Sequence, residues 1–319
     1  HLVKKISNYN IAVDHNKKNI DLRVRKEVLK IKKADIVIHL AGKIPSEGNY
    51  SKNIFFEHNV LGTLNILEYC IKNKVKKMIF VSSYVYGIPK KNPINEKQQV
   101  KPHNTYAKSK VLCEELCKIY AQKYKIQIII LRPFNIYGNL QKDNSLISNI
   151  IKSIKNNNNI TIINKNNKRD YLFIDDLIDA IIKLIDYKCK FESFNIGSGK
   201  SYSFEKIVQF FEKRTKKKIK RKYEISKSNR IPKIQADISK IKKVCELIKK
   251  EFESGNQVVV VSSAMSGETN KLVDLAENFD VTNNKKEYDM IVSTGEQISI
   301  ALISMALKEI GILAKPLLG

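Results

Sequence analysis

Short apolar runs alternate with longer amphipathic stretches through the first half of the chain. Three runs bounded by polar residues or glycine predict buried parallel strands, namely Asp35–Gly42, Lys77–Ser83 and Ile126–Leu131. Apolar residues at helical spacing predict helices over Asn59–Asn73 and Tyr106–Tyr124. Strands that alternate with helices in this way indicate an α/β fold with a doubly wound, Rossmann-like parallel sheet.

The opening residues extend the same pattern. Leu2–Ile6 is predicted to end a helix, and Tyr9–Asp14 to form a short strand that finishes in an acid. A helical stretch is predicted to follow Asp21-Leu22 and to run to about Lys32. An acidic side chain at the end of a strand in such a sheet is where the ribose hydroxyls of a dinucleotide are held. Asp14 is therefore a candidate cofactor contact.

The chemistry that stands out lies at the start of the second predicted helix. Tyr106 and Lys110 are four residues apart, so they share one helix face and the ammonium can lie beside the phenol. A positive charge close to a phenol favours the phenolate, which makes the tyrosine a usable general base. The plainer alternative is an exposed tyrosine beside a solvated lysine.

Charge raises a second class of function. The chain of 319 residues has 58 Lys and Arg against 32 Asp and Glu, a net charge of +26. Such a balance can indicate nucleic-acid binding. The excess is nearly all lysine, mixed with asparagine and isoleucine, and no basic stretch is interleaved with aromatic residues. Biased residue usage therefore explains the charge better, and nucleic-acid binding ranks last among the hypotheses.

The five cysteines show no disulfide framework and no Cys-x-x-Cys spacing, and no residue set predicts a metal site. The sequence shows no signal peptide and no apolar run long enough to span a bilayer. We therefore expect a cytoplasmic protein with no membrane partner.

A series of short motifs in a fixed order gives residues 1–242 a specific resemblance. They are Asp14 after a strand, Asp21-Leu22, His39-Leu40-Ala41-Gly42, Asn59-Val60-Leu61-Gly62-Thr63, Val81-Ser82-Ser83-Tyr84-Val85-Tyr86-Gly87, Tyr106-x-x-x-Lys110, Leu131-Arg132-Pro133-Phe134-Asn135-Ile136-Tyr137-Gly138, Arg169-Asp170-Tyr171, Asp175-Asp176 and Asn195-Ile196-Gly197. Together they resemble the extended short-chain dehydrogenase/reductase family, the NAD-dependent epimerases and dehydratases of nucleotide sugars.

The resemblance implies a catalytic triad of Ser82, Tyr106 and Lys110. Ser82 would bind the sugar oxygen, Tyr106 would move the proton, and Lys110 would also hold the nicotinamide ribose of NAD. The alternative for Ser82 is a hydroxyl at a strand end that backbone groups satisfy. The dehydratases carry Asp-Glu after the triad hydroxyl, where this chain has Ser83-Tyr84, so an epimerase is favoured.

The resemblance also implies a cofactor side and a substrate side. The predicted cofactor contacts are Asp14, Asp21, Leu22, Leu40, Ala41, Gly42, Asn59 and Lys110. Ser83, Asn135 and Arg169 would face a nucleotide-diphosphate sugar, because a guanidinium suits phosphate oxygens. The intact parent would be a homodimer.

The glycine-rich turn that opens this family, and the strand before it, have no counterpart in the sequence, which begins within the helix that follows them. Backbone N–H groups of that turn bind the pyrophosphate. We therefore expect an incomplete sheet, and an inactive chimeric or partial product is an alternative to the enzyme.

The last quarter of the chain differs from the rest. Residues 243–319 carry 8 basic against 11 acidic residues, whereas residues 1–242 carry 50 against 21. Gln257–Thr269 and Glu287–Gln297 resemble the aspartate kinase family, with Thr294 and Glu296 on its aspartate-binding side. A fragment of an aspartate kinase, which transfers a phosphoryl group in its intact parent, is a further alternative.

Three parts are therefore predicted: an NAD-binding part over 1–138, a mainly substrate-binding part over 139–242, and an αβα fragment of an amino-acid-kinase fold over 243–319. The join falls within 237–244. We expect the last part to pack poorly on the first two, because the partners of its predicted strand Val258–Val261 are missing.

Overall fold

The structure, a computed structural model, describes residues 20–45, 53–138, 141, 145–156, 158–225 and 231–240. The chain divides into two compact units, 1–242 and 243–319, and everything described belongs to the first. The predictions for Asp14, Thr294, Glu296, the opening strand, the join and the kinase-like part lie outside the described residues.

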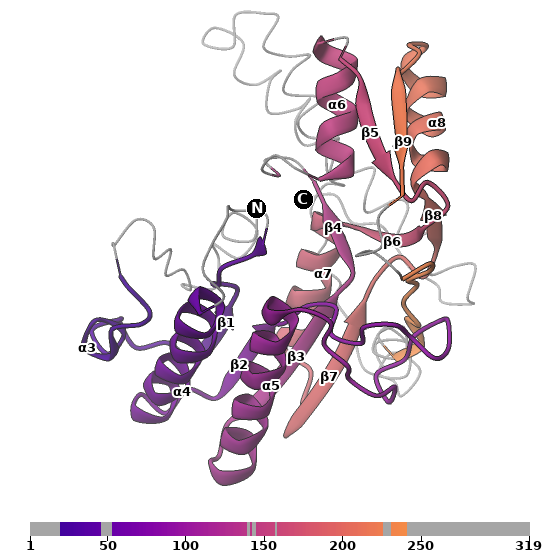
Figure 1. Ribbon diagram of the computed structural model, residues 1–319. Helices are drawn as coiled ribbons and strands as arrows, with labels where there is room; N and C mark the ends of the chain where they lie inside the picture. The colour runs from indigo at the N-terminus through magenta and orange to yellow at the C-terminus, as the bar shows by residue number, and fades with distance from the viewer. Residues whose placement is uncertain are drawn as a thin grey trace, which may run out of the picture. The chain divides into compact units, whose positions relative to one another are not determined.

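A parallel four-stranded sheet forms the centre of this unit (Figure 1). Its strands lie in the order β1 (Ile36–His39), β2 (Lys77–Val81), β3 (Gln127–Pro133) and β7 (Phe191–Ile196). The three predicted strands are all present, and β7 adds the fourth. All five residues of β2 are buried, as its continuous apolar run requires in a sheet covered on both faces.

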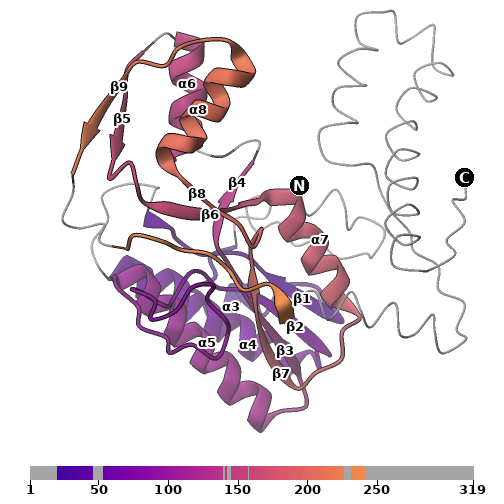
Figure 2. The ribbon, with the colours of Figure 1, turned by 90° about the vertical axis from the view of Figure 1, so that its right-hand side faces the viewer.

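Helices cover both faces of the sheet (Figure 2). One face carries α4 (Gly62–Lys72) and α5 (Thr105–Lys123), and the other carries α7 (Ile174–Ile185). Both predicted helices are confirmed within a few residues, although α4 is preceded by a turn of π-helix, η3 (Phe56–Leu61). The helical stretch expected before Lys32 is shorter, since only α3 (Arg25–Val28) forms.

A smaller layer stands beyond the ends of β3 and β7. It contains one sheet in the order β4, β6, β8 and a parallel pair, β5 and β9, packed on two helices. These elements are β4 (Asn135–Tyr137), α6 (Leu146–Asn156), β5 (Ile160–Ile163), β6 (Lys168–Phe173), β8 (Ser201–Ser203), α8 (Phe204–Thr215) and β9 (Arg221–Glu224). The apolar face of α6 packs through Ile150 onto Ile162 and Val208.

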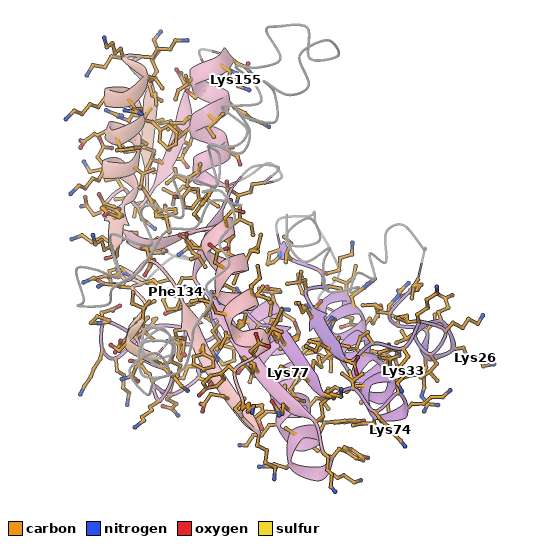
Figure 3. The ribbon with its side chains drawn as sticks, turned by 180° about the vertical axis from the view of Figure 1, so that it is seen from behind. Lys26, Lys33, Lys74, Lys77, Phe134 and Lys155 are labelled. Carbon is orange, nitrogen blue, oxygen red and sulfur yellow. The ribbon has the colours of Figure 1, made fainter. Side chains whose placement is uncertain are left out.

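Two buried side chains show how the layers are tied together (Figure 3). Lys77 begins β2, and its ammonium donates to the Tyr187 carbonyl at 2.8 Å and to carbonyls in the last turn of α7, where the helix dipole favours a cation. Burial lowers the pKa of Lys77.

Phe134 follows β3 directly and packs with Tyr86 and Ile234 in the core between the two layers. The chain therefore passes into the smaller layer at the carboxyl ends of the strands.

Candidate active site

The first turns of α5 lie against the carboxyl end of β2, so the helix brings Tyr106 to the strand-end serines. The Asn104 side chain begins the helix by accepting a hydrogen bond from the Ala107 N–H at 2.7 Å. The Phe55 ring meets the Tyr106 ring edge-on at 5.8 Å. Burial raises the pKa of Tyr106, and the nearby Ser83 side chain opposes that rise by less.

Lys110 does not act on Tyr106 as the spacing predicted. Its ammonium donates to the Val81 carbonyl at 2.9 Å and lies 4.7 Å from the centre of the Phe80 ring. Burial lowers the pKa of Lys110, and Lys110 is absent from the causes that shift the pKa of Tyr106. The predicted lowering of the Tyr106 pKa is therefore wrong for the ligand-free chain. A shared helix face brings the Cβ atoms of Tyr106 and Lys110 to the same side, but the long lysine side chain can still place its ammonium against the sheet.

The two strand-end serines point to different partners. The Ser82 hydroxyl is buried and donates to Glu114 Oε1 at 2.5 Å, whereas Ser83 is only half-buried and lies near Tyr106. Both serines therefore lie at the carboxyl end of β2, close to the helix that carries Tyr106 and Lys110.

The loop after β1 approaches the same edge of the sheet from the other side. Leu40 is exposed, Gly42 has no side chain, and Asn59 from η3 ties down the next residue. The Asn59 amide accepts from the Lys43 N–H at 2.7 Å and donates to the Lys43 carbonyl at 3.2 Å and to Ser109 Oγ at 3.1 Å. Single π turns are frequent at functional sites, and here the turn places an amide between loop and helix.

Replacing Gly42 with alanine should destabilise the unit by about 1–3 kcal/mol, because the added carbon would stand 2.9 Å from Asn59 Oδ1, a buried atom already held by a hydrogen bond. Urea unfolding followed by circular dichroism measures the change. Gly62→Ala is the matched control: its new carbon would meet only Leu22 Cβ at 3.4 Å, and alanine suits a helix better than glycine. Equal stability of the two variants would contradict the crowding at Gly42.

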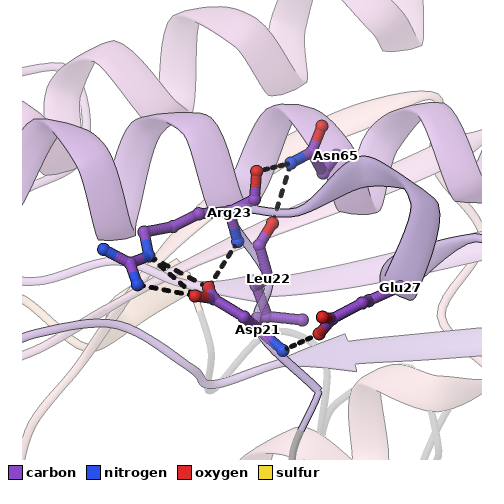
Figure 4. A network of polar contacts seen from close by, with 5 residues as sticks. All are labelled: Asp21, Leu22, Arg23, Glu27 and Asn65. Carbon is purple, nitrogen blue, oxygen red and sulfur yellow. Dashed lines mark hydrogen bonds and ion pairs between the residues drawn. The ribbon is translucent and has the colours of Figure 1, made fainter.

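Asp21 and Leu22 lie in a fixed turn in front of α4 (Figure 4). Asn65, buried on α4, donates to the carbonyls of Leu22 at 2.8 Å and Arg23 at 3.0 Å, and the Asp21 N–H donates to Glu27 at 2.6 Å. The Arg23 guanidinium holds the Asp21 carboxylate, with Nη2 at 2.6 Å from Oδ2. The predicted cofactor contacts therefore start from a prearranged backbone.

The Asp21 turn gives a pH-dependent contribution to stability. The side-chain hydrogen bond from Arg23, helped by the Arg23 backbone N–H, lowers the pKa of Asp21 from 3.8 to about 2. A depressed pKa stabilises the folded state above the unfolded pKa, and this stabilisation disappears as the pH falls from about 4 to about 2. The free energies of unfolding of the native chain and of Asp21→Asn, measured across that interval, should therefore converge; a constant difference would refute the pairing.

On the substrate side, the predicted residues meet backbone groups. Asn135 donates to the Asp170 carbonyl at 3.0 Å, and the buried Arg169 donates to the carbonyls of Lys168 and Ile231, both at 2.9 Å. Burial lowers the pKa of Arg169. Around Arg169 the structure adds a residue that the sequence did not indicate, His103, whose ring centre lies 6.5 Å from that of Tyr84.

Glu114 and Arg132 form a second feature that the sequence analysis missed. They make a buried ion pair beside Ser82, with Arg132 Nη2 2.6 Å from Glu114 Oε2. The signal was an acid on the buried face of α5, between Cys113 and Cys117. Among the described residues no three His, Cys, Asp or Glu side chains gather as metal ligands, and no helix there is long and apolar enough to cross a bilayer.

A parallel sheet with helices on both faces, and a tyrosine, a serine and a lysine at the carboxyl ends of its strands, define a doubly wound α/β protein of the nucleotide-binding class. Residues 3–197 match the NAD dependent epimerase/dehydratase family, and the chain belongs to that family. Residues 225–319 match the amino acid kinase family, so the second resemblance is confirmed as well.

Individual relatives agree with the family. A putative UDP-glucose 4-epimerase of Methanocaldococcus jannaschii is 34% identical over 198 residues, which cover 59% of this chain and 64% of the relative. UDP-glucose 4-epimerase 4 of Oryza sativa is 32% identical over 228 residues, covering 63% of this chain and 62% of that protein. The chain thus spans slightly less than two thirds of the length of these two relatives.

Solved structures agree on the fold. The UDP-glucose 4-epimerase of Thermus thermophilus in complex with NAD superposes with a TM-score of 0.66 at 20% identity, over 76% of this chain and 88% of that one. The UDP-glucuronic acid 4-epimerase of Bacillus cereus, in complex with UDP-glucuronic acid and NAD, gives 0.64 at 26% identity, over 76% and 79%. The Rossmann-like prediction is confirmed.

Proposed function

We propose that the first unit is an NAD-dependent epimerase of a nucleotide-diphosphate sugar, with Tyr106, Ser83 and Lys110 at its centre. The observation that carries the proposal is the placement of the Tyr106 phenol, packed on Phe55, beside the half-buried Ser83 at the carboxyl end of β2. Hydroxyls gathered at the mouth of a parallel sheet can take over a proton from a sugar hydroxyl and give it back.

The exposures and contacts of the two serines bear on which hydroxyl would meet the sugar. The sequence assigned that task to Ser82, but its hydroxyl is buried and engaged with Glu114. Ser83 is less buried and lies near the tyrosine, so Ser83 is a second candidate for the sugar contact. Because burial raises the pKa of Tyr106, the resting phenol keeps its proton at neutral pH and takes part first in hydrogen bonding.

The residues at the end of β1 fit the cofactor. Gly42 leaves room where a Cβ would collide with Asn59, and Leu40 offers exposed apolar surface beside it. When bound, NAD supplies a reversible hydride acceptor. In this proposal Lys110 holds the cofactor ribose. Its ammonium is oriented by the Val81 carbonyl and lies 3.7 Å from the position that a Cβ on Gly42 would take. The same path is lined by Asp21, Leu22, Ala41 and Asn59.

An epimerase fits the residues after the serine better than a dehydratase. Elimination of water needs an acid pair after the triad hydroxyl. Ser83 is followed instead by Tyr84 and Val85, neither of which is an acid, and the Tyr84 hydroxyl donates to the Gly87 carbonyl at 2.7 Å. The conclusion is the same for either serine. The names of the relatives in Methanocaldococcus and rice support the same reaction.

The buried guanidinium and the structural neighbours support the proposed substrate class. Arg169 and Asn135 line the smaller layer, where a diphosphate would find a positive charge, and the Bacillus cereus neighbour holds UDP-glucuronic acid. Leu112 and Ile119 leave apolar side chains exposed on one face of α5, which supports a homodimer.

The test is product analysis. The full chain with NAD is incubated with a panel of UDP-hexoses and UDP-hexuronic acids, and proton NMR follows inversion at each ring carbon. Appearance of one epimer, reaching the same equilibrium from both sides, is the expected result. Saturable NAD binding without any epimer would leave the family intact and overturn the reaction; loss of a water from the sugar would indicate a dehydratase.

A further inference from the structure

The outer face of α8 gathers positive charge around one exposed aromatic ring. Lys206, Phe210 and Lys213 follow one another at spacings of four and three residues, so they share a helix face, and Arg214 borders it. All four side chains are exposed, and 64% of Phe210 is open to solvent. A single exposed ring is ordinary on a protein surface, but Phe210 stands in the middle of a group of cations.

The positive charge continues beyond the end of the helix. Eight of the ten residues over 213–222 are Lys or Arg. The buried Ile219 fixes this run to the core of the smaller layer, whereas the lysines on either side of it are exposed. The surface that we call the α8 patch consists of Lys206, Phe210, Lys213, Arg214, Lys216 and Lys217.

The acids of the same segment are turned away from the α8 patch. Glu205 and Glu212 face β9, where Arg221 Nη2 donates to Glu212 Oε2 at 3.2 Å and lies 3.5 Å from Glu205 Oε1. The Tyr223 hydroxyl donates to Glu205 at 2.8 Å, and the Ile219 N–H donates to Glu212 at 2.9 Å. Within the described part of the chain, no cation of the α8 patch pairs with an acid, so the whole charge of the patch faces outward.

This combination of side chains complements a planar anionic surface. Long lysine side chains can lay their methylenes on apolar material and keep the ammonium at the level of lipid phosphates. An exposed aromatic ring among such cations can enter the boundary between headgroups and acyl chains. A single-stranded nucleic acid, the other common polyanion, is bound by stacking successive bases on several rings in a groove, and the α8 patch has one ring on a helix face.

We propose that the α8 patch docks the chain reversibly on membranes rich in anionic lipid, with Phe210 as the apolar contact. The attachment is to the lipid surface and needs no spanning helix. Figure 1 and Figure 2 both show α8 in the part of the smaller layer that is remote from the central sheet, so the docked face and the strand-end residues are separate. The proposal is independent of the proposed reaction, and it revises the sequence-based expectation of no membrane partner.

The test is cosedimentation of the full chain with vesicles. Vesicles of phosphatidylglycerol and phosphatidylcholine in equal parts should bind the chain at about 0.1 M NaCl and release it at about 1 M, where screening shortens the range of the attraction. The variant Lys213→Gln/Arg214→Gln/Lys217→Gln should bind roughly 10- to 100-fold more weakly, because each cation near the surface adds to the attraction. All three side chains are exposed, so circular dichroism should show an unchanged fold.

The matched control removes the same number of charges elsewhere. Lys26→Gln/Lys30→Gln/Lys33→Gln changes three exposed lysines in and after α3. Figure 3 shows Lys26 and Lys33 at the opposite end of the unit from Lys155 of α6, the helix that packs beside α8. Its vesicle binding should stay within about threefold of that of the native chain.

A second pair of variants tests the aromatic contact. Phe210→Ala should weaken binding to the mixed vesicles by roughly 3- to 10-fold, because it removes the apolar surface that enters the headgroup boundary. Ile88→Ala is the control, since Ile88 is 62% exposed and lies outside the α8 patch. It should bind like the native chain. Equal binding by Phe210→Ala and the native chain would refute the apolar contact.

Three results would overturn the docking itself. Equal losses in the two triple variants would mean that the net charge of the chain, and no particular face, attracts the vesicles. Binding to pure phosphatidylcholine as tight as to the mixture would remove the anionic lipid from the account. Vesicle binding that the patch variants leave unchanged, while their binding to a mixed-sequence oligonucleotide falls, would assign the α8 patch to nucleic acid. None of these measurements needs NAD or turnover, so the proposed reaction is tested separately.

Discussion

Replacing Tyr106 with phenylalanine should lower the turnover of the nucleotide sugar by about 10²–10⁴-fold, the usual loss when a group that transfers a proton is removed. The hydroxyl is the one part of Tyr106 that the substitution deletes, and the ring keeps its edge-on contact with Phe55. Binding of the sugar should change little. The measurement is kcat and KM from epimer formation, followed by NMR in the chain with NAD added.

Tyr124→Phe provides the control for this experiment, because Tyr124 caps the far end of the same helix, where its ring packs beside Tyr120. It should turn over like the native chain. Turnover of Tyr106→Phe within a few-fold of the native rate would rule out proton transfer by this tyrosine. Loss of NAD binding in the same variant would instead indicate a structural task.

Replacing Asp170 with asparagine should cost roughly 3–5 kcal/mol of stability, the largest effect that we expect for a single side chain outside the active site. The carboxylate is completely buried and accepts four hydrogen bonds, from the N–H and hydroxyl of Ser198 at 2.7 Å each and from the N–H groups of Gly199 and Ala236 at 3.0 Å each. An amide nitrogen in place of either oxygen would face donors, so buried N–H groups would lose their acceptor.

Hydrogen exchange measured by mass spectrometry shows where the loss falls. Peptides that contain Ser198, Gly199 and Ala236 should exchange faster in Asp170→Asn, and urea unfolding gives the total change in free energy. Asp35→Asn, at an exposed carboxylate paired with Lys76, should stay within about 0.5 kcal/mol of the native chain. A native-like exchange pattern around Ser198 would contradict the network.

Hydrophobic periodicity was sufficient to predict the elements that bury a whole strand or one whole helix face. The strand predicted over Lys77–Ser83 and the helix over Tyr106–Tyr124 form almost as expected, because a buried run or an apolar helix face has few alternative structures. The stretch before Lys32 gave a weaker result, since a single short helix, Arg25–Val28, forms where a longer one was expected. The conformation of this stretch depends on hydrogen bonds with Asn65 and Glu27, which the local sequence pattern does not predict.

The partners of individual side chains could not be predicted from the sequence. The order of motifs located the candidate site, but only the three-dimensional structure shows that the Ser82 hydroxyl is bonded to Glu114. The long side chain of Lys110 likewise reached the Val81 carbonyl and not the phenol. Glu114 escaped notice because its partner, Arg132, lies on a different strand.

The amide of Asn59 has a consequence for the thermodynamics of ligand binding. It forms hydrogen bonds with both the N–H and the carbonyl of Lys43, and it donates to Ser109 Oγ. The Ser109 hydroxyl in turn donates to the Tyr106 carbonyl at 2.8 Å. The backbone at Lys43 therefore loses its conformational entropy when the chain folds and has little left to lose to a ligand. A dinucleotide that settles there should bind without the large negative heat-capacity change that marks coupled folding, and titrations at several temperatures would record an enthalpy that varies only slightly.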